Sequence, residues 1–141
     1  MQLELQCPVF PTEDLEKVSI ALTNLFPHIN IDPESTQPMD KITMKISGKD
    51  SVAFLRQFVH ETRIIDAVRK KLVANWTGSE TIIHFDKQTA YIGKIRLIDE
   101  VDDVSSLGSI ETKFIFENDT EFETFLSWFV PPTKDGRIVR H

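Results

Sequence analysis

The sequence has little of what several protein classes require. It has one cysteine, Cys7, so no disulfide can form within the chain, as is typical of proteins in a reducing cytosol. Five glycines in 141 residues argue against a flexible or collagen-like chain. No apolar run approaches the roughly 18 residues of a membrane span, and the N-terminus lacks the basic start and apolar segment of a signal peptide. We therefore expect a cytoplasmic protein with no membrane partner.

The residue patterns of common active sites and metal sites are also missing. The four histidines are scattered without a metal-ligand spacing, and there is no second cysteine. Neither a Gly-x-Ser-x-Gly elbow nor a Gly-x-Gly-x-x-Gly loop occurs. We expect no catalytic residues, no metal, no cofactor and no enzymatic activity. An enzyme with an unrecognised site stays an alternative, and a pocket with convergent polar residues would favour it.

What is present is a sizeable apolar fraction inside an acidic chain. Hydrophobic residues make up 40% of the sequence, enough for one compact core, and the net charge is −6. Proteins that coat nucleic acid through their overall charge are usually basic. Any nucleic-acid contact in this chain would therefore need a local basic patch.

Several segments alternate apolar and polar residues with a period of two, which predicts half-buried strands. They are residues 2–10, 41–47, 81–98 and 109–117. In the first, Cys7 falls on the apolar side and is expected to be a small buried side chain. Residues 81–98 are interpreted as a hairpin that turns at residues 86–88 and forms the middle of the sheet. Residues 2–10 are expected at a sheet edge.

Other segments repeat apolar residues every three or four positions, which predicts amphipathic helices. They are residues 15–26, 51–76 and 122–129. The polar stretch 60–63 suggests that the second segment bends into two helices. Residues 28–40 and the acidic stretch 99–103 are expected to be solvated loops. Arg63 and Asp66 are interpreted as a structural pair or cap at the helix junction, and a functional role is the alternative.

The order of elements predicts an α+β fold. The simplest packing is a two-layer sandwich, with a mostly antiparallel sheet of four to five strands and the helices on one face. We expect a single domain over residues 1–132, followed by a polar C-terminal tail over residues 133–141.

The polar side of the expected strands carries mainly cations. They are Lys41, Lys45, His84, Lys94, Arg96 and Lys113, against Glu4 and Glu111. Lys87 lies at the expected hairpin turn. This pattern predicts a locally basic, open sheet face on an acidic protein. The alternative is an ordinary solvated face with a chance bias in charge.

Short motifs along nearly the whole chain match one known family. They are Pro11–Thr12–Glu13–Asp14 with Lys17–Val18, Asn24 with Phe26–Pro27, Arg63–Ile64–Ile65–Asp66–Ala67 with Arg69, Lys87–Gln88 with Gly93–Lys94, Leu107–Gly108, Trp128 with Pro131, and Thr133 with Asp135–Gly136. The sequence resembles the archaeal uncharacterised protein family 0201. It departs from the family pattern at Asp86 and Thr89 of the turn, and at Ser109, where the family often has proline.

The resemblance implies a single α+β domain similar to the large-subunit ribosomal protein L-five fold. It also implies RNA as a partner, with no assigned reaction and no cofactor. Lys45, Lys87, Lys94 and Arg96 would then contact phosphates, and no exposed aromatic pair suggests base stacking. The alternative is a protein-interaction module or homodimer that uses the expected edge strand or the open sheet face.

Overall fold

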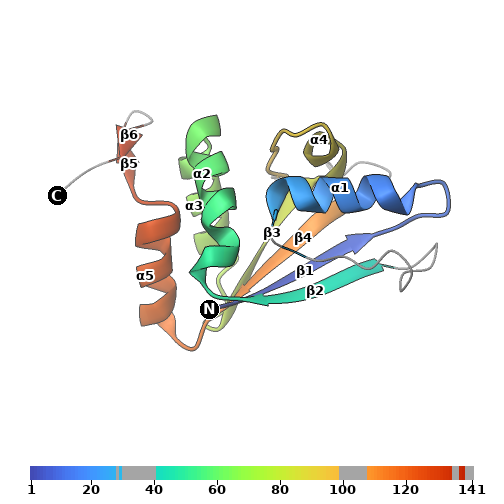
Figure 1. The fold of residues 1–141 in the computed structure, drawn as a ribbon. Coiled ribbons are helices and arrows are strands. Elements are labelled where there is room, and N and C mark those ends of the chain that lie inside the picture. Colours follow the sequence, from blue (N-terminus) through green and yellow to red (C-terminus); the bar gives the residue numbers. More distant parts are fainter. Residues whose placement is uncertain (28, 30–40, 99–107, 135–136, 139–141) are drawn as a thin grey trace.

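The computed structural model describes residues 1–27, 29, 41–98, 108–134 and 137–138 (Figure 1). The expected loops at 28–40 and 99–103 fall almost entirely outside these residues. The elements are β1 (Gln2–Pro8), α1 (Leu15–Leu25), β2 (Lys41–Ser47), the 3-10 helix η2 (Lys49–Val52), α2 (Ala53–Thr62), α3 (Ile65–Ala74), β3 (Glu80–Asp86), α4 (Lys87–Tyr91), β4 (Ser109–Ile115), α5 (Asp119–Phe129), β5 (Thr133–Lys134) and β6 (Arg137–Ile138).

The main sheet is antiparallel and has the strand order β2-β1-β4-β3. The helices lie on one side of it, with α1 and α4 side by side (Figure 1). The expected α+β sandwich with helices on one face is therefore confirmed. The expected edge position of residues 2–10 is wrong, because β1 pairs with both β2 and β4, and β2 and β3 form the edges.

The core lies between the sheet and the helices, where the period-two pattern placed it. In β1, Leu3, Leu5 and Cys7 are buried while the alternate residues stay partly accessible, so the expected burial of Cys7 is confirmed. Phe114 of β4 contacts Phe125 of α5, with 5.4 Å between the ring centroids. Each such fully buried side chain contributes roughly 1.5–3 kcal/mol.

The segment predicted to bend does form two helices, α2 and α3. Arg63 between them has φ 62°, in the left-handed region. Its N–H bonds to the His60 carbonyl, and the Ile64 N–H bonds to the Val59 carbonyl. These two bonds make a Schellman motif, which usually has glycine at the left-handed position. The chain turns here because this motif satisfies the last carbonyls of α2.

The predicted hairpin over residues 81–98 is wrong in its second half. Asp86 ends β3, and its carboxylate accepts a hydrogen bond from the Thr89 N–H at 3.0 Å, which caps a helix. The chain then forms α4 instead of a turn and strand. Only Leu97 makes an isolated bridge, to Phe85, so β3 is an edge strand and not the middle of the sheet.

Gly93 ends α4 in a second Schellman motif. Its φ of 81° is favourable only for glycine, and the Lys94 N–H bonds to the Thr89 carbonyl while the Gly93 N–H bonds to that of Ala90. An aspartate cap and a glycine stop seven residues apart therefore outweigh an alternating pattern. With this correction Tyr91 moves from the predicted buried face to the surface. Lys94 and Arg96 are exposed as predicted, but they do not lie on the sheet.

The segment expected to be a polar tail begins with regular structure. Thr133–Lys134 pairs with Arg137–Ile138 as a two-stranded ribbon, and the Thr133 hydroxyl donates a hydrogen bond to Asp66 of α3. The domain boundary at residue 132 remains a prediction. Across the described parts of the chain, no helix combines the length and apolarity needed to cross a bilayer.

Candidate nucleic-acid interface

The face of the sheet opposite the helices carries side chains in cross-strand rows. In one row, Glu4 of β1 lies between Lys45 of β2 and Lys113 of β4. The Glu4 carboxylate is 3.8 Å from the Lys45 ammonium and 3.9 Å from the Lys113 ammonium. Exposed pairs of this kind contribute only about 0–1 kcal/mol. The two lysines therefore stay available to a ligand, but they share one carboxylate.

The next row places His84 of β3 opposite Glu111 of β4. The His84 ring nitrogen Nδ1 is 3.1 Å from the Ser109 hydroxyl oxygen. Lys41 lies in β2 with its backbone opposite Pro8, and its side chain falls outside what the structure describes. The structure thus brings Lys45, His84 and Lys113 onto one face.

This face has no positive excess among its described side chains. The accessible or half-buried ionisable residues on it are Glu4, Lys45, Glu80, His84, Glu111 and Lys113. Three carboxylates offset two lysines and a histidine. The prediction of a cationic face counted Lys94 and Arg96, which do not belong to the sheet, and omitted Glu80. The charge balance predicted from the sequence is therefore wrong.

Lys94 and Arg96 lie in the segment after α4. Its backbone is held against β3 by a hydrogen bond from the Asp86 N–H to the Arg96 carbonyl, at 2.9 Å. Both side chains are exposed, and neither forms an ion pair or hydrogen bond with any residue that the structure describes. They are free cations on an ordered backbone, although not on the sheet.

Lys87 lies in the interior rather than at a surface turn. Its ammonium donates to Glu13 Oε1 at 2.7 Å and to the Pro8 carbonyl at 2.8 Å, and its side chain is 3% exposed. The Glu13 carboxylate also accepts the Phe10 N–H at 3.0 Å. Lys87 therefore joins α4 to the chain that enters α1. The predicted phosphate contact at Lys87 conflicts with this burial.

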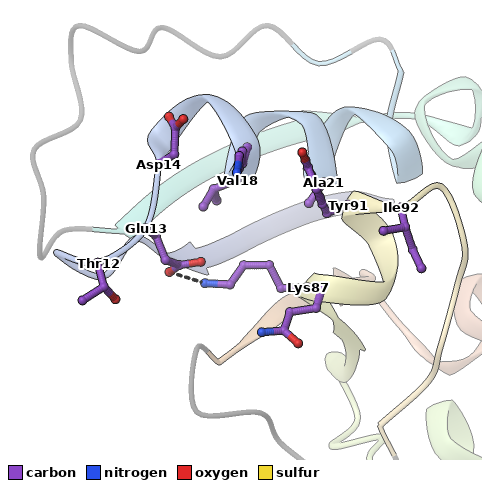
Figure 2. Close-up of a pocket in the computed structure, with 10 residues that line it drawn as sticks. Thr12, Glu13, Asp14, Val18, Ala21, Lys87, Tyr91 and Ile92 are labelled. Atoms are coloured by element: carbon purple, nitrogen blue, oxygen red, sulfur yellow. Dashed lines mark hydrogen bonds and ion pairs between the residues drawn. The ribbon is translucent and has the colours of Figure 1, made fainter.

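The ion pair of Glu13 and Lys87 lies at a cavity of about 420 Å³ between α1 and α4 (Figure 2). Val18 and Ala21 of α1 form part of its wall, and Ile92 lies at its other side. The cavity is mostly apolar, and its two most buried charged groups already pair with each other. It therefore has room for a small, largely apolar group, with the polar side chains of Thr12, Lys17 and Gln88 also in its lining.

Tyr91 also lines this cavity, and the sequence pattern did not predict it as a surface residue. The period-two pattern placed Tyr91 on the buried face of a strand, whereas it is 40% exposed at the end of α4. The Lys17 ammonium lies 5.9 Å from the centre of its ring. The spacing of Asp86 and Gly93 was the signal that could have shown a short helix and hence this exposure.

Cys7 lies close enough to the buried ion pair to sense both charges. Burial raises the pKa of its thiol to about 12, with the Lys87 charge acting to lower the pKa and the Glu13 charge acting to raise it. The thiol is therefore protonated at neutral pH, so it is inert as a nucleophile.

Arg63 and Asp66 do not pair with each other. Arg63 occupies the left-handed position that ends α2, and Asp66 accepts the hydrogen bond of the Thr133 hydroxyl. Arg63 thus takes part in the cap expected at the helix junction, and the preference for structural over functional roles remains a prediction. Among the residues placed in the structure, no group of three His, Cys, Asp or Glu side chains is arranged to hold a metal ion.

Comparison with known proteins identifies first the broad class of this protein and then its family. Residues 2–115 match a family model described as RNA binding, and the chain belongs to that family. More particularly, the chain belongs to the UPF0201 family. It is 32% identical over 135 residues to a UPF0201 protein of Thermococcus kodakarensis, covering 96% of this chain and 93% of that protein. The resemblance seen in the sequence is thereby confirmed.

A longer relative is a UPF0200/UPF0201 protein of Archaeoglobus fulgidus. It is 30% identical over 141 residues, which cover 99% of this chain but 40% of that protein. This chain therefore spans less than half the length of that relative. Neither of these names indicates a catalytic activity.

Solved structures of the same family share the fold. A UPF0201 protein of Methanococcus jannaschii superposes with a TM-score of 0.81 at 26% identity, covering 99% of this chain and 100% of that one. Another UPF0201 crystal structure gives a TM-score of 0.78 at 28% identity, covering 99% and 100%. The likeness to the ribosomal protein L-five fold remains a prediction.

Proposed function

We propose that the chain is a cytoplasmic RNA-binding domain without catalytic activity. The observation that carries this proposal is the match of residues 2–115 to a family model described as RNA binding. The exposed side chains of Lys94 and Arg96 support it, because they form no ion pair with a described residue and can therefore contact phosphates. The net charge of −6 means that only a local patch can supply these contacts.

The proposed phosphate contacts come from the residues predicted from the sequence, namely Lys41, Lys45, His84, Lys87, Lys94, Arg96 and Lys113. This predicted set is reduced to the members that the structure leaves accessible. Lys94 and Arg96 supply the least neutralised charges, and Lys45, His84 and Lys113 supply weaker ones on the sheet. Lys41 is kept as a proposed contact because its backbone lies in β2, the strand that also carries Lys45. Lys87 is left out because its ammonium is buried and already paired.

Few phosphates are expected to be bound. Two free cations and two shared lysines predict two to three phosphate contacts, which gives a slope of log affinity against log salt of roughly −1.4 to −2.1 on single strands. Five residues after Lys94 the sequence continues into the acidic stretch 99–103, which limits the attraction further. We expect moderate, salt-sensitive binding without strong sequence preference.

The test is fluorescence anisotropy with a labelled single-stranded RNA, titrated at several salt concentrations. The double variant Lys94→Ala/Arg96→Ala is expected to weaken binding about 10-fold and to reduce the magnitude of the salt slope by about 1.4. The matched control Lys17→Ala/Lys70→Ala removes the same charge elsewhere and is expected to bind normally. Equal losses in both variants would mean that only overall charge matters and that these contacts are not used.

A second candidate function is protein interaction, which the fused relative favours. In the Archaeoglobus fulgidus protein, the segment similar to this chain fills 40% of a longer chain named UPF0200/UPF0201. Modules that are joined in one chain hold each other at high effective concentration, and their separate counterparts often associate. We propose a separate UPF0200 protein as the partner. Tyr91 and Ile92, which are 40% and 66% exposed beside the cavity, are the proposed contacts.

Co-purification after nuclease treatment separates the two candidates. A complex with a co-expressed UPF0200 protein that survives nuclease, and that Ile92→Asp abolishes, would support the second candidate. Loss of the complex on nuclease treatment would leave RNA as the bridge. Size-exclusion chromatography of the chain alone tests the remaining alternative, a homodimer.

A further inference from the structure

One cluster of basic side chains lies outside the set of residues predicted from the sequence, around Trp128 of α5. The Lys49 ammonium of η2 is 5.6 Å from the centre of the Trp128 ring, and the Arg56 guanidinium of α2 is 5.2 Å from it. Trp128 itself is half-buried, with its ring 6.0 Å from that of Phe125. An accessible aromatic ring thus has two cations beside it.

The C-terminal end of α5 gathers further donors at the same place. Arg56 Nε donates to the Trp128 carbonyl at 2.6 Å, the His60 ring nitrogen Nε2 donates to the Phe129 carbonyl at 2.8 Å, and Arg69 donates to the Val130 carbonyl at 2.8 Å. These are three consecutive carbonyls of a helix end, so the donors converge. The negative end of the helix dipole favours them.

These bonds explain why the cluster is ordered, but they use few of its donors. Each guanidinium has five N–H groups arranged in a planar fork, and one from each of Arg56 and Arg69 is accounted for by a carbonyl. Over the described part of the chain, no carboxylate forms an ion pair with Lys49, Arg56 or Arg69. The full positive charges of Arg56 and Arg69 therefore face the partial charge of one helix end, and Lys49 adds a third charge beside the Trp128 ring.

We propose that this Trp128 cluster, comprising Lys49, Arg56, His60, Arg69 and Trp128, binds one nucleotide of single-stranded RNA. The proposal rests on the RNA-binding function proposed above. It goes beyond that function in naming a stacking site on the helical layer, at a residue outside the matched range 2–115.

The cluster offers a contact for each part of a nucleotide, the base and the phosphate. The base stacks on the Trp128 ring, a contact that tolerates any sequence because every base has a π-face. Lys49 is exposed on a flexible stem, so a base can displace its ammonium from the ring toward the phosphate. The forks of Arg56 and Arg69 are held in place by the helix end, and they match the geometry of phosphate oxygens.

Stacking has a direct spectroscopic readout in this chain. Trp76 and Trp128 are its two tryptophans, and Trp76 stacks on Phe122 with 4.0 Å between ring centroids. The variant Trp76→Phe makes Trp128 the sole emitter. Titration with a 12-nucleotide single-stranded RNA is expected to quench its emission in step with the rise in anisotropy. In the reciprocal variant Trp128→Phe, the emission of Trp76 is expected to stay constant.

Affinity measurements on surface variants complete the test. Lys49→Ala and Arg56→Lys are expected to weaken binding about threefold or more, and Trp128→Leu about fivefold or more, from the loss of one stacked base and its phosphate. Lys70→Ala is the charge-matched control for Lys49→Ala and is expected to bind normally. Thermal melts identify any variant that is partly unfolded, and Lys49→Ala changes an exposed side chain.

The possible results separate this proposal from the one that it rests on. Two results together would overturn the Trp128 site and leave RNA binding intact. RNA binding would be detected by anisotropy without quenching of the Trp128 emission, and Lys49→Ala would bind RNA with normal affinity. Absence of any RNA binding by the wild-type chain would overturn both.

Discussion

Removal of the Lys87 charge tests whether this lysine holds the fold together or contacts RNA. In Lys87→Met the side chain keeps its length, but the Glu13 carboxylate loses a partner at 2.7 Å and the Pro8 carbonyl loses its donor at 2.8 Å. The Glu13 side chain is only 10% exposed, so water cannot replace the lysine well. We therefore expect the variant to be strongly destabilised.

The size of this effect follows from the geometry. At 2.7 Å and an effective dielectric constant of about 20, the attraction between the two charges is about 6 kcal/mol. The cost of removing both charges from water offsets most of this attraction. When one partner is removed, the remaining buried charge keeps its own desolvation cost and has no attraction to offset it. Breaking a buried pair typically costs about 3–5 kcal/mol, which lowers the Tm of a domain of this size by about 6 °C or more.

The assay is urea denaturation of four proteins, namely the wild type, Lys87→Met, Glu13→Gln and the double variant. Each single variant is expected to lose about 3 kcal/mol of unfolding free energy. The double variant is expected to lose clearly less unfolding free energy than the two single losses added together, because it leaves neither charge without a partner. RNA affinity of folded Lys87→Met is expected to equal that of the wild type. A variant with normal stability and weakened RNA binding would refute this reasoning and restore Lys87 as a contact.

Three further changes test single features of the fold. Arg63→Gly is expected to raise stability by about 0.5–1 kcal/mol in thermal melts, because glycine suits the φ of 62°, and a loss would show that the Arg63 side chain itself stabilises the fold. Thr112→Val is expected to raise stability by about 1 kcal/mol, because no described residue bonds the buried Thr112 hydroxyl, and a destabilised variant would reveal a partner for it. The Cys7 thiol, whose pKa is raised by burial from 9.0 to about 12, contributes stability that is fully present below pH 9 and is lost as the pH rises toward 12. The stability of the wild type relative to Cys7→Ala is therefore expected to fall between pH 9 and 11, and parallel curves would contradict it.

Local patterns in the sequence predicted most elements of the fold. The alternation in β1, β2 and β4 and the apolar stripes of α1 and α5 reflect burial on one side, and that side is the same in the folded protein. The segment after β3 was mispredicted because Ile95 alternates like a strand residue, while the decisive signals are the cap at Asp86 and the glycine at position 93. Those signals are local and were available.

The charge of the candidate interface depended on information that the sequence does not contain. Glu4 lies between two lysines only because of the strand order and register of the sheet. Lys87 is buried because Glu13, 74 positions away in the chain, reaches it across two elements. The cations around the end of α5 come from η2, α2 and α3, and no pattern within one segment indicates that they converge.

RNA binding is tested most directly by the affinity of the unmodified chain for single-stranded RNA, measured by anisotropy between low and physiological salt. Binding is expected at low salt, and it is expected to weaken with a log–log slope of roughly −1.4 to −2.1 for two or three phosphates at the predicted residues, about 0.7 steeper with the phosphate at the Trp128 cluster. Absence of binding at low salt, or binding that does not change with salt, would contradict the proposed RNA binding.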